Sequence, residues 1–498
     1  MTALSLAVKP DKKQELPVRA VQFGEGAFLR GFIDWMLYKL NEAGYFKGSV
    51  MALQNTQYGK TVPVLHSQDC LYTVNLHGVK NGKKEETFEV VNVISKAKNP
   101  YRDWEEILET ARSEDLRFVF SNTTEAGIVY KRQELTGTAP ETFPARLCVF
   151  LHERFLKFRT CQCGSGLFIL PCELIENNGG ELRKIVLQHA RDFGFESEFE
   201  AWVLEDCSFL NTLVDRVVSG FPEGREKAFF RQLGYEDQLL VCAESFGFMA
   251  IEAPLAFRDE LPFEKAGLNV TVSPDITPYR VRKVRILNGA HTAVVPSAYM
   301  AGLETVDQMM GHPIYGDFVR NVVLNEIIPA TSLEPGMLNS FAQDVFARFT
   351  DPDMHHQLSS IMMNSTSKIK ARILPTLHDA RARGTLPKLL CLSLAAYICL
   401  YKNVSGAGSQ VEVIRDEGRS GFFEDDPQAV KILEEAWTHY QGSEASALFT
   451  VKAVLSKSEL WGSDLSSDVD LQATVARYTH SIITDGIDDA VTAVLEQC

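Results

Sequence analysis

The chain has 498 residues, of which 45% are hydrophobic and 23% are charged, a composition typical of a globular protein with about two to four domains. Asp and Glu outnumber Lys and Arg by 65 to 50, and a formal charge of −15 argues against binding to nucleic acid or to an anionic membrane. No apolar run approaches the roughly 18 residues of a membrane span, and residues 1–17 lack the pattern of a secretory signal. We therefore expect a cytoplasmic protein that acts on a small molecule; its oligomeric state stays open.

Metal-binding patterns are weak throughout the chain. Of the ten cysteines, only Cys161 and Cys163 form a tight pair, and no second pair follows at the spacing of a zinc site. The adjacent His355 and His356 would point in different directions on a helix. The sequence predicts free thiols and no metal site.

The first elements are a strand, a glycine turn, a helix and a second strand. Residues 18–23 form a short apolar run that ends at Gly24-Glu-Gly26, and residues 27–43 repeat apolar side chains every four positions. Residues 49–53 form the next apolar run, so the segment predicts a βαβ unit.

The glycine turn lies where a dinucleotide pyrophosphate binds in such units. Glycine lets the backbone approach the phosphates, and the start of the following helix offers free N–H groups. Leu29 replaces the third glycine of the usual pattern, so a simple chain reversal remains the alternative. The second strand lacks the usual acidic residue at its end: Gln54 or Asn55 could bond a ribose hydroxyl, and the residues alone leave NAD or NADP open.

Alternating strands and helices continue to about residue 275 and favour a mostly parallel sheet covered on both faces. Strands are expected at residues 71–76, 88–94, 118–120 and 167–170, a helix at 104–111, and a hairpin turn at Asn81-Gly82. Beyond this point helical periodicity dominates, as in residues 281–295, 354–374, 389–401 and 427–498, whereas 405–421 reads as a loop. We predict an α/β protein with a Rossmann-type dinucleotide-binding domain over residues 1–275 and a mostly helical domain over 276–498.

The most informative segment carries Lys283, Asn288 and His291. On one α-helix these side chains would lie at about 0°, 140° and 80°, with roughly 12 Å along the axis from Lys283 to His291. Gly289 would leave room beside them for a ligand. A lysine can act as acid/base for an alcohol, and amide and imidazole groups can hold the oxygen without a metal. The alternative is a solvated basic face with a structural histidine.

This pattern resembles the mannitol dehydrogenase family of polyol-specific long-chain dehydrogenases, and within it the branch that acts on hexuronate-derived keto acids. The resemblance covers nearly the whole chain. Besides the Lys–Asn–His motif, it includes Gly24-x-Gly26-x-Phe28-x-Arg30, Gln68-Asp-Cys-Leu71-Tyr72-Thr73, Ser121-Asn-Thr-Thr-Glu125-Ala-Gly127, Cys172-Glu-Leu-Ile-Glu-Asn-Asn178-Gly179 and Asn211-x-x-Val-Asp215-Arg216.

The resemblance implies roles for these residues. Lys283 would be the general acid/base, Asn178 and Asn288 would form the oxyanion hole, and His291 would bond the reacting or a neighbouring hydroxyl. Asp215 would lie near the substrate, although an ion pair with a neighbouring arginine is an equal alternative. NAD would be the cofactor, and no metal would take part. The implied cofactor-binding residues are Gly24, Gly26, Phe28, Arg30, Gln54, Thr123 and Glu125.

Two departures from the family affect these assignments. Leu174 stands where polyol enzymes carry an asparagine, which weakens the role of Asn178, and Arg280 replaces a glutamate of the mannitol enzymes. We hypothesise that Arg280 or Arg282 binds a substrate carboxylate, because a planar guanidinium suits bidentate contact. Pairing of both arginines with surface acids is an equal alternative. Lys368, with Lys370 nearby, is a further candidate for this contact.

The resemblance implies reversible, NAD-linked reduction of D-tagaturonate to D-altronate in hexuronate catabolism. A fructuronate reductase or a mannitol dehydrogenase of the same family is the first alternative. A dinucleotide sensor without catalytic activity is the alternative from a different class.

Overall fold

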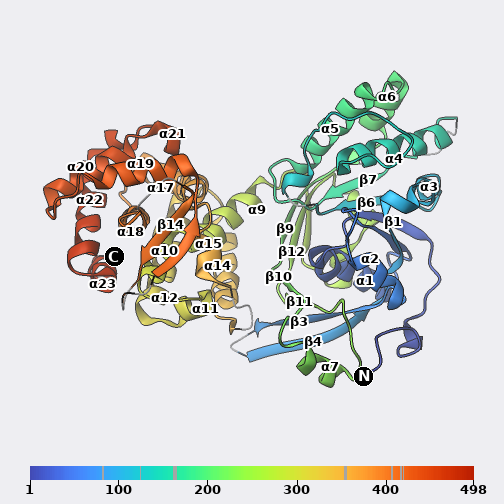
Figure 1. Cartoon of the computed structure of the whole chain (residues 1–498), viewed down its shortest axis with the longest axis horizontal. Helices are drawn as coiled ribbons and strands as arrows, with labels where there is room; N and C mark the ends of the chain where they lie inside the picture. The colour runs from blue at the N-terminus through green and yellow to red at the C-terminus, as the bar shows by residue number, and fades with distance from the viewer. Residues whose placement is uncertain are drawn as a thin grey trace. The chain divides into compact units, whose positions relative to one another are not determined.

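The computed structural model describes residues 1–80, 83–123, 125–160, 165–352, 356–404, 408–415, 418 and 420–498. The chain folds into two compact units: the first comprises Met1–Gly78 and Lys84–Ile276, and the second contains Thr277–Cys498 (Figure 1). The break after Ile276 falls one residue from the expected boundary. We describe each unit separately.

A six-stranded parallel sheet forms the centre of the first unit, in the order β5-β2-β1-β6-β7-β8. Its strands are β1 (Val18–Phe23), β2 (Ser49–Leu53), β5 (Ile94–Lys98), β6 (Phe118–Ser121), β7 (Phe168–Pro171) and β8 (Ser208–Phe209). The chain proceeds from β1 to one edge of the sheet and then continues at β6 on the other side of β1. This reversal of strand order is where doubly wound sheets bind ligands, at the carboxyl ends of the strands.

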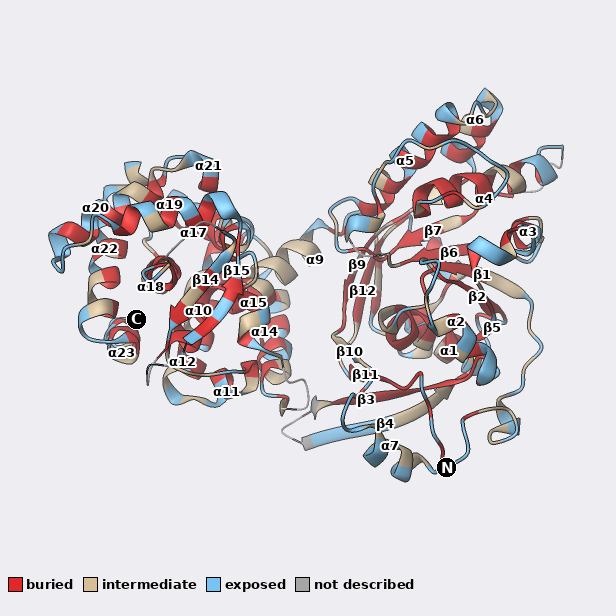
Figure 2. Cartoon of the chain, in the orientation of Figure 1, coloured by how far each residue is buried: buried red, intermediate tan, exposed pale blue. Residues whose placement is uncertain are grey.

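Side chains of β1 alternate between two hydrophobic clusters, because successive residues of a strand point to opposite faces. Ala20 belongs to a cluster with Phe32 and Met36, whereas Val21 and Phe23 belong to a cluster with the helices of the other face. Figure 2 shows the sheet as the buried layer between these helices. The helices of this unit are α1 (Asp34–Glu42), α2 (Thr61–Ser67), α3 (Pro100–Ala111), α4 (Phe143–Phe158), α5 (Asn178–Asp192), α6 (Ser197–Glu205), α7 (Glu226–Leu233) and α8 (Phe257–Glu260), with the π-helix η2 (Leu29–Ile33) before α1 and the short turns η1 (Pro10–Lys12), η3 (Glu125–Gly127) and η4 (Phe263–Ala266).

Two smaller sheets complete the first unit. One has the order β10-β11-β3-β4, with strands β10 (Val218–Gly220), β11 (Val241–Glu244), β3 (Tyr72–Lys80) and β4 (Lys83–Val91). The other has the order β13-β12-β9, with strands β13 (Val270–Ser273), β12 (Phe248–Glu252) and β9 (Asn211–Asp215). The predicted turn at Asn81-Gly82 lies outside the described residues.

The second unit is mostly helical and carries one described hairpin. Its helical segments are α9 (Thr277–Arg282), η5 (Lys283–Asn288), α10 (Gly289–Met300), α11 (Val306–Gly311), α12 (Pro313–Asn321), η6 (Val322–Ile327), α13 (Ile328–Ala330), α14 (Pro335–Phe349), α15 (Leu358–Met362), α16 (Ser365–Lys368), η8 (Ile369–Ile373), α17 (Leu374–Ala382), α18 (Lys388–Leu400), α19 (Pro427–Trp437), α20 (Glu444–Leu455), α21 (Ser458–Trp461), η10 (Leu465–Ser467), α22 (Val469–Thr484) and α23 (Ile487–Leu495). The hairpin consists of β14 (Gln410–Ile414) and β15 (Ser420–Glu424), which pair antiparallel.

The hairpin corrects the prediction that residues 405–421 form a loop. Gln410 pairs with Glu424 and Ile414 with Ser420, and alternate residues of β14, Val411 and Val413, are buried. The abundance of glycine and serine in this stretch concealed the strand alternation. The predicted helix over 354–374 is also wrong in detail, because the described part of it is divided into α15, α16 and η8.

None of the helices in the described ranges has both the length and the apolar composition to cross a membrane. Within those ranges, no three His, Cys, Asp or Glu side chains are grouped so that they could hold a metal ion. Cys161, Cys163 and His355 lie outside the described residues, and the other eight cysteines are free thiols.

Candidate functional site

The glycine turn follows β1 at the carboxyl edge of the central sheet. The N–H of Gly24 donates to the carbonyl of Leu53 over 2.9 Å, and its φ of +126° is one that L side chains rarely adopt. A Cβ at Gly24 would lie 3.0 Å from the carbonyl oxygen of Asn122, whereas a Cβ at Gly26 would meet nothing within 4 Å. Gly24 therefore allows the ends of three strands to approach each other, and Gly26 leaves open space above the turn. This geometry suits a dinucleotide pyrophosphate.

Arg30 binds the backbone of this turn through its side chain. Its guanidinium is buried and donates to the carbonyl of Glu25 over 3.0 Å and to the carbonyl of Leu239 over 2.5 Å. It also lies 5.4 Å from the ring centroid of Tyr72. Because these groups engage the guanidinium inside the unit, we assign Arg30 to positioning the turn. The sequence predicted direct contact with the cofactor.

A buried carboxyl group, Asp34, lies in the same polar network. The amide of Gln22 donates to Asp34 Oδ2 over 3.2 Å, and burial raises the pKa of Asp34 to about 7 despite the attraction of Arg30. Within the described part of the chain, Oδ1 of Asp34 and Oε1 of Gln22 are buried without a hydrogen-bond partner. A proton on Asp34 therefore removes the cost of burying its negative charge.

Asp34 makes stability depend on pH. Its folded-state pKa lies above the ordinary 3.8, so its contribution is largest at low pH and falls as pH rises from about 4 to about 7. We expect the free energy of unfolding, relative to the D34N variant, to fall by about 2 kcal/mol between pH 5 and pH 8. Urea unfolding of both proteins at the two pH values measures this difference, and an equal difference at both would refute the assignment.

The side chains of the other predicted cofactor residues have different environments. Phe28 is half-buried and packs edge-on against Phe32, with ring centroids 5.7 Å apart. Gln54 is buried, and its amide donates to the carbonyl of Thr56 over 2.7 Å. This bond directs the amide nitrogen of Gln54 to its own loop. The side chain of Glu125 lies outside the described residues.

Glu173 joins the carboxyl ends of β6 and β7, and sequence reasoning missed it. Its Oε1 accepts from the N–H and the hydroxyl of Thr123, both over 2.9 Å, and its Oε2 accepts from the Ser121 hydroxyl over 3.0 Å. Burial is the main cause that raises the pKa of Glu173. Thr123 is therefore held by this carboxyl group at the edge where the glycine turn lies. Glu173 is one acidic residue within the Cys172–Gly179 motif, and nothing in that motif indicates a contact with Thr123.

The side chain of Asn178 is committed to the backbone of its own unit. Its amide nitrogen lies 2.9 Å from the carbonyl of Pro171, 3.1 Å from that of Glu173 and 3.2 Å from that of Thr212. Its oxygen accepts from the N–H groups of Gly179 and Thr212. With the residue 1% exposed, neither amide hydrogen is left for a substrate oxygen. We therefore assign Asn178 to joining β7, α5 and β9, and not to the predicted oxyanion hole.

Asp215 ends β9 in the first unit and is buried. The neighbouring Arg216 is also buried, and its guanidinium donates to the carbonyls of Gly31, Ser245 and Phe246. Burial is the main cause that lowers the pKa of Arg216 to about 10. Arg216 thus joins the helical segment at Gly31 to the loop between β11 and β12, and contact of Asp215 with a substrate stays a proposal.

The Lys–Asn–His motif spans two helical segments of the second unit. Lys283 begins η5 and Asn288 ends it, and η5 is a π-helix instead of the predicted α-helix; His291 follows in α10. A π turn closes after five residues, so Asn288 lies one turn from Lys283 and more nearly on the same face than in an α-helix. Both side chains are half-buried, and among the described residues the Asn288 amide makes no hydrogen bond. An uncommitted amide one turn from a lysine suits a donor to a developing oxyanion.

The sequence predicted that Gly289 leaves room for a ligand, and this prediction is wrong. A Cβ there would lie 3.6 Å from Cδ1 of Ile327 and 3.8 Å from the main-chain oxygen of Arg372. The glycine therefore faces the packed segments η6 and η8. It contributes to helix packing behind the motif.

His291 is buried in an aromatic and cationic environment. Its ring stacks on Phe349 with centroids 4.2 Å apart and meets His356 edge-on at 5.3 Å. Burial, followed by the positive neighbours His356 and Arg372, holds the pKa of His291 well below its usual value. A neutral imidazole can donate from one nitrogen and accept at the other.

The arginines of the motif region have different surroundings. The guanidinium of Arg282 lies 4.3 Å from the ring centroid of Phe341, and its charge lies near Asp344. Arg285 donates to the hydroxyl of Thr376 over 2.8 Å and to Asp379 over 2.9 Å. Arg285 therefore fastens η5 to α17. Arg280 is half-buried at the end of α9.

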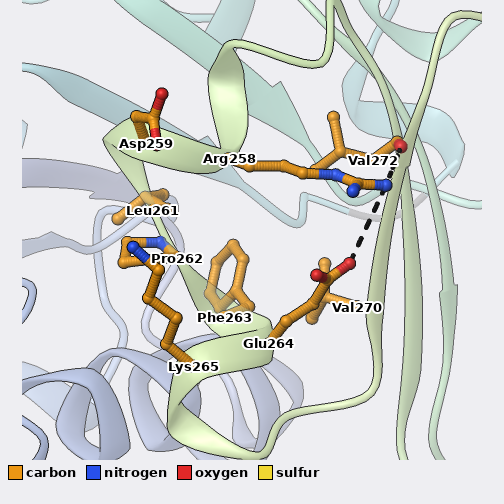
Figure 3. A pocket seen from close by; sticks show the side chains of 9 residues that line it. All are labelled: Arg258, Asp259, Leu261, Pro262, Phe263, Glu264, Lys265, Val270 and Val272. Carbon is orange, nitrogen blue, oxygen red and sulfur yellow. Dashed lines mark hydrogen bonds and ion pairs between the residues drawn. The ribbon is translucent and has the colours of Figure 1, made fainter.

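A further pocket in the first unit carries none of the predicted site residues (Figure 3). Leu261, Pro262 and Phe263 form its apolar wall, and two of the four charged residues that line it, Arg258 and Glu264, lie 3.8 Å apart. Arg258 also donates to the carbonyl of Val272 over 3.2 Å. Arg258 and Glu264 are thus directed at each other and at the backbone.

A Rossmann-type unit with an open glycine turn, followed by a helical unit that carries a lysine, an amide and an imidazole, defines a dinucleotide-dependent dehydrogenase. The chain belongs to the mannitol dehydrogenase family: residues 18–265 match the mannitol dehydrogenase Rossmann domain and residues 275–483 match the mannitol dehydrogenase C-terminal domain. The predicted fold class and membership of this enzyme family are confirmed.

Similar proteins extend over almost the whole chain. The chain is 39% identical to an altronate oxidoreductase of Halalkalibacterium halodurans, over 98% of this chain and 95% of the relative. It is 39% identical to the altronate oxidoreductase of Bacillus subtilis, over 97% and 96%. Its fold is similar to that of Pseudomonas fluorescens mannitol 2-dehydrogenase, solved with NAD and D-mannitol (TM-score 0.71, 20% identity, 97% of this chain and 95% of that chain). It is also similar to a D-sorbitol dehydrogenase (TM-score 0.76, 21% identity, 96% and 95%).

Proposed function

We propose that the protein catalyses the reversible, NAD-linked reduction of D-tagaturonate to D-altronate. The observation that carries the proposal is the continuous segment with Lys283, Asn288 and the buried imidazole of His291, in which the Asn288 amide makes no hydrogen bond to the part of the chain that the structure describes. Full-length similarity to proteins named altronate oxidoreductase supports a sugar acid as the substrate. The mannitol 2-dehydrogenase solved with NAD supports the choice of cofactor.

The residues of the first unit suit a dinucleotide. Gly26 leaves open space over the turn, Gly24 permits the close approach of three strands, and Arg30 holds the backbone of the turn. A bound nicotinamide would supply the hydride that converts the ketone carbon into an alcohol carbon. The pyrophosphate would lie over the glycine turn, at the start of the helix that follows β1.

The residues of the second unit handle the proton and the oxygen. Lys283 donates a proton to the ketone oxygen during reduction and accepts it from the hydroxyl during oxidation. Asn288 donates a hydrogen bond to the oxygen while negative charge develops on it. His291 bonds the reacting or a neighbouring hydroxyl. This scheme asks no Lewis acid to polarise the ketone.

The test is the steady-state rate of NADH oxidation with D-tagaturonate, D-fructuronate and D-fructose, each with and without a chelator. We expect kcat/KM for tagaturonate to be the highest and to exceed that for fructose by at least about 100-fold, because the site is built for a sugar acid. A higher value for fructuronate or fructose would assign the other activity. NADH binding without turnover of any ketone would indicate a sensor.

A further inference from the structure

Two cations lie beside His291 in the second unit. Lys368, at the end of α16, donates to the carbonyl of Ile361 over 2.7 Å. Arg372, in η8, donates to the hydroxyl of Thr292 over 3.2 Å, and Thr292 directly follows His291. Arg372 is therefore held at the α10 segment that carries the histidine of the motif, whereas Lys368 is held at α15.

A small pocket opens at this place. His291, Thr292 and Lys368 contribute to its lining, together with apolar residues such as Val295 and Ile361. Its volume of about 10 Å³ has room for one small polar group at the end of a ligand. His291 is 7% exposed, and within the described part of the chain its Nε2 is buried without a hydrogen-bond partner. A buried nitrogen without a partner is costly unless a bound group satisfies it.

The positive charges of Lys368 and Arg372 are not neutralised by ion pairs with acidic side chains in the described structure. Among the described residues, neither Lys368 nor Arg372 forms an ion pair. The acid whose charge reaches Lys368 is Asp425, but its Oδ2 accepts from the N–H of Thr366 over 2.9 Å and from the hydroxyl of Tyr401 over 2.5 Å. Burial, with the charge of Arg372, lowers the pKa of Lys368 to about 8. An anion here would relieve the repulsion between the two cations.

We propose that Lys368, which lines this pocket, and Arg372, which donates to its Thr292, bind the carboxylate of the substrate next to Nε2 of His291 and so select sugar acids over neutral keto sugars. The inference rests on the proposed function and specifies its substrate subsite. A guanidinium and an ammonium together supply charge-assisted hydrogen bonds to a carboxylate. The site lies at the His291 end of the motif, whereas Lys283 begins it. The carboxylate end of an extended sugar acid is thus held away from Lys283, the proposed acid/base.

Two of the earlier candidates for this contact, Arg282 and Lys370, are less suited to it. The guanidinium of Arg282 already lies over the ring of Phe341 and near the charge of Asp344. Lys370 lies against the end of α21, where a Cβ at Gly462 would be 3.7 Å from its Nζ. Lys370 thus provides a matched control: a cation two residues from Lys368 with different surroundings.

The test compares R372M, K368M and R372K with the control K370M in steady-state kinetics on D-tagaturonate. We expect R372M and K368M to raise KM by about 10- to 100-fold with kcat within about threefold. R372K keeps the positive charge but loses the planar guanidinium, so it should raise KM by less than R372M does. K370M should change KM by less than about twofold. Thermal unfolding of each variant checks that it is folded.

Calorimetric binding to the NADH-loaded protein gives a readout that needs no turnover. D-gluconate is the acidic probe, and D-sorbitol is its neutral counterpart. We expect R372M and K368M to weaken gluconate binding at least about 10-fold relative to wild type and K370M, with sorbitol binding the same in all. Unchanged KM and unchanged gluconate binding in R372M and K368M would overturn the subsite while leaving the proposed reaction intact. Charge-dependent gluconate binding without tagaturonate turnover would retain the subsite and reject the reaction.

Discussion

Replacing Lys283 with methionine is expected to lower kcat for tagaturonate reduction by about 10²- to 10⁴-fold, the usual contribution of a positioned acid/base. Lys283 begins the π segment, half-buried and one turn from the amide of Asn288. Methionine has a similar length but carries no proton. The glycine turn belongs to the first unit, so the Kd for NADH should stay within about twofold of wild type.

The kinetics of K283M are compared with those of K370M, which removes a cation from η8 in the same unit. The control should retain kcat. If K283M lost NADH binding while single-turnover hydride transfer stayed fast, Lys283 would have a cofactor role and not the proposed one. A pH profile of kcat that is unchanged in K283M would also contradict the assignment.

Replacing Gly26 with alanine is expected to raise the Kd for NADH by at least about 100-fold without changing stability. A Cβ at Gly26 meets nothing within 4 Å in the protein, so the added methyl group should not disturb folding. The same methyl group would occupy the space over the turn that a pyrophosphate needs. Fluorescence titration with NADH measures the first quantity, and thermal unfolding measures the second.

Gly24→Ala is the matched comparison for this prediction. Gly24 has a φ of +126°, and its Cβ would lie 3.0 Å from the Asn122 carbonyl and 3.1 Å from Leu29, so alanine introduces strain. We expect this variant to lose about 1–3 kcal/mol of stability as well as cofactor affinity. NADH binding by G26A that equals wild type would place the cofactor away from the turn.

The sequence predicted the parts of the fold that depend on local pattern. The apolar run of β1, the glycine turn and the four-residue repeat after it are all local, and the structure has them where expected. The π segments were missed, because a single extra residue in a turn leaves the apolar periodicity almost unchanged. The hairpin of β14 and β15 was missed, because glycine and serine outweighed a short alternation.

The candidate site was predictable only where its residues are adjacent in the chain. Lys283, Asn288 and His291 lie within nine residues, so their spacing carried the signal. The hydrogen bonds of Asn178 to Thr212 and of Thr123 to Glu173 join segments far apart in sequence, and pairing across such distances leaves no local pattern. The same holds for the contact between Arg372 and Thr292.

The central claim is that the amine of Lys283 acts directly on the reacting carbon–oxygen bond. A crystal structure of the protein with NAD and D-altronate measures this most directly. We predict that Nζ of Lys283 lies at hydrogen-bond distance, about 2.7–3.2 Å, from the reacting hydroxyl, with the Asn288 amide on the same oxygen. A ternary complex in which Nζ points into solvent, or in which a metal ion contacts that hydroxyl, would contradict the account.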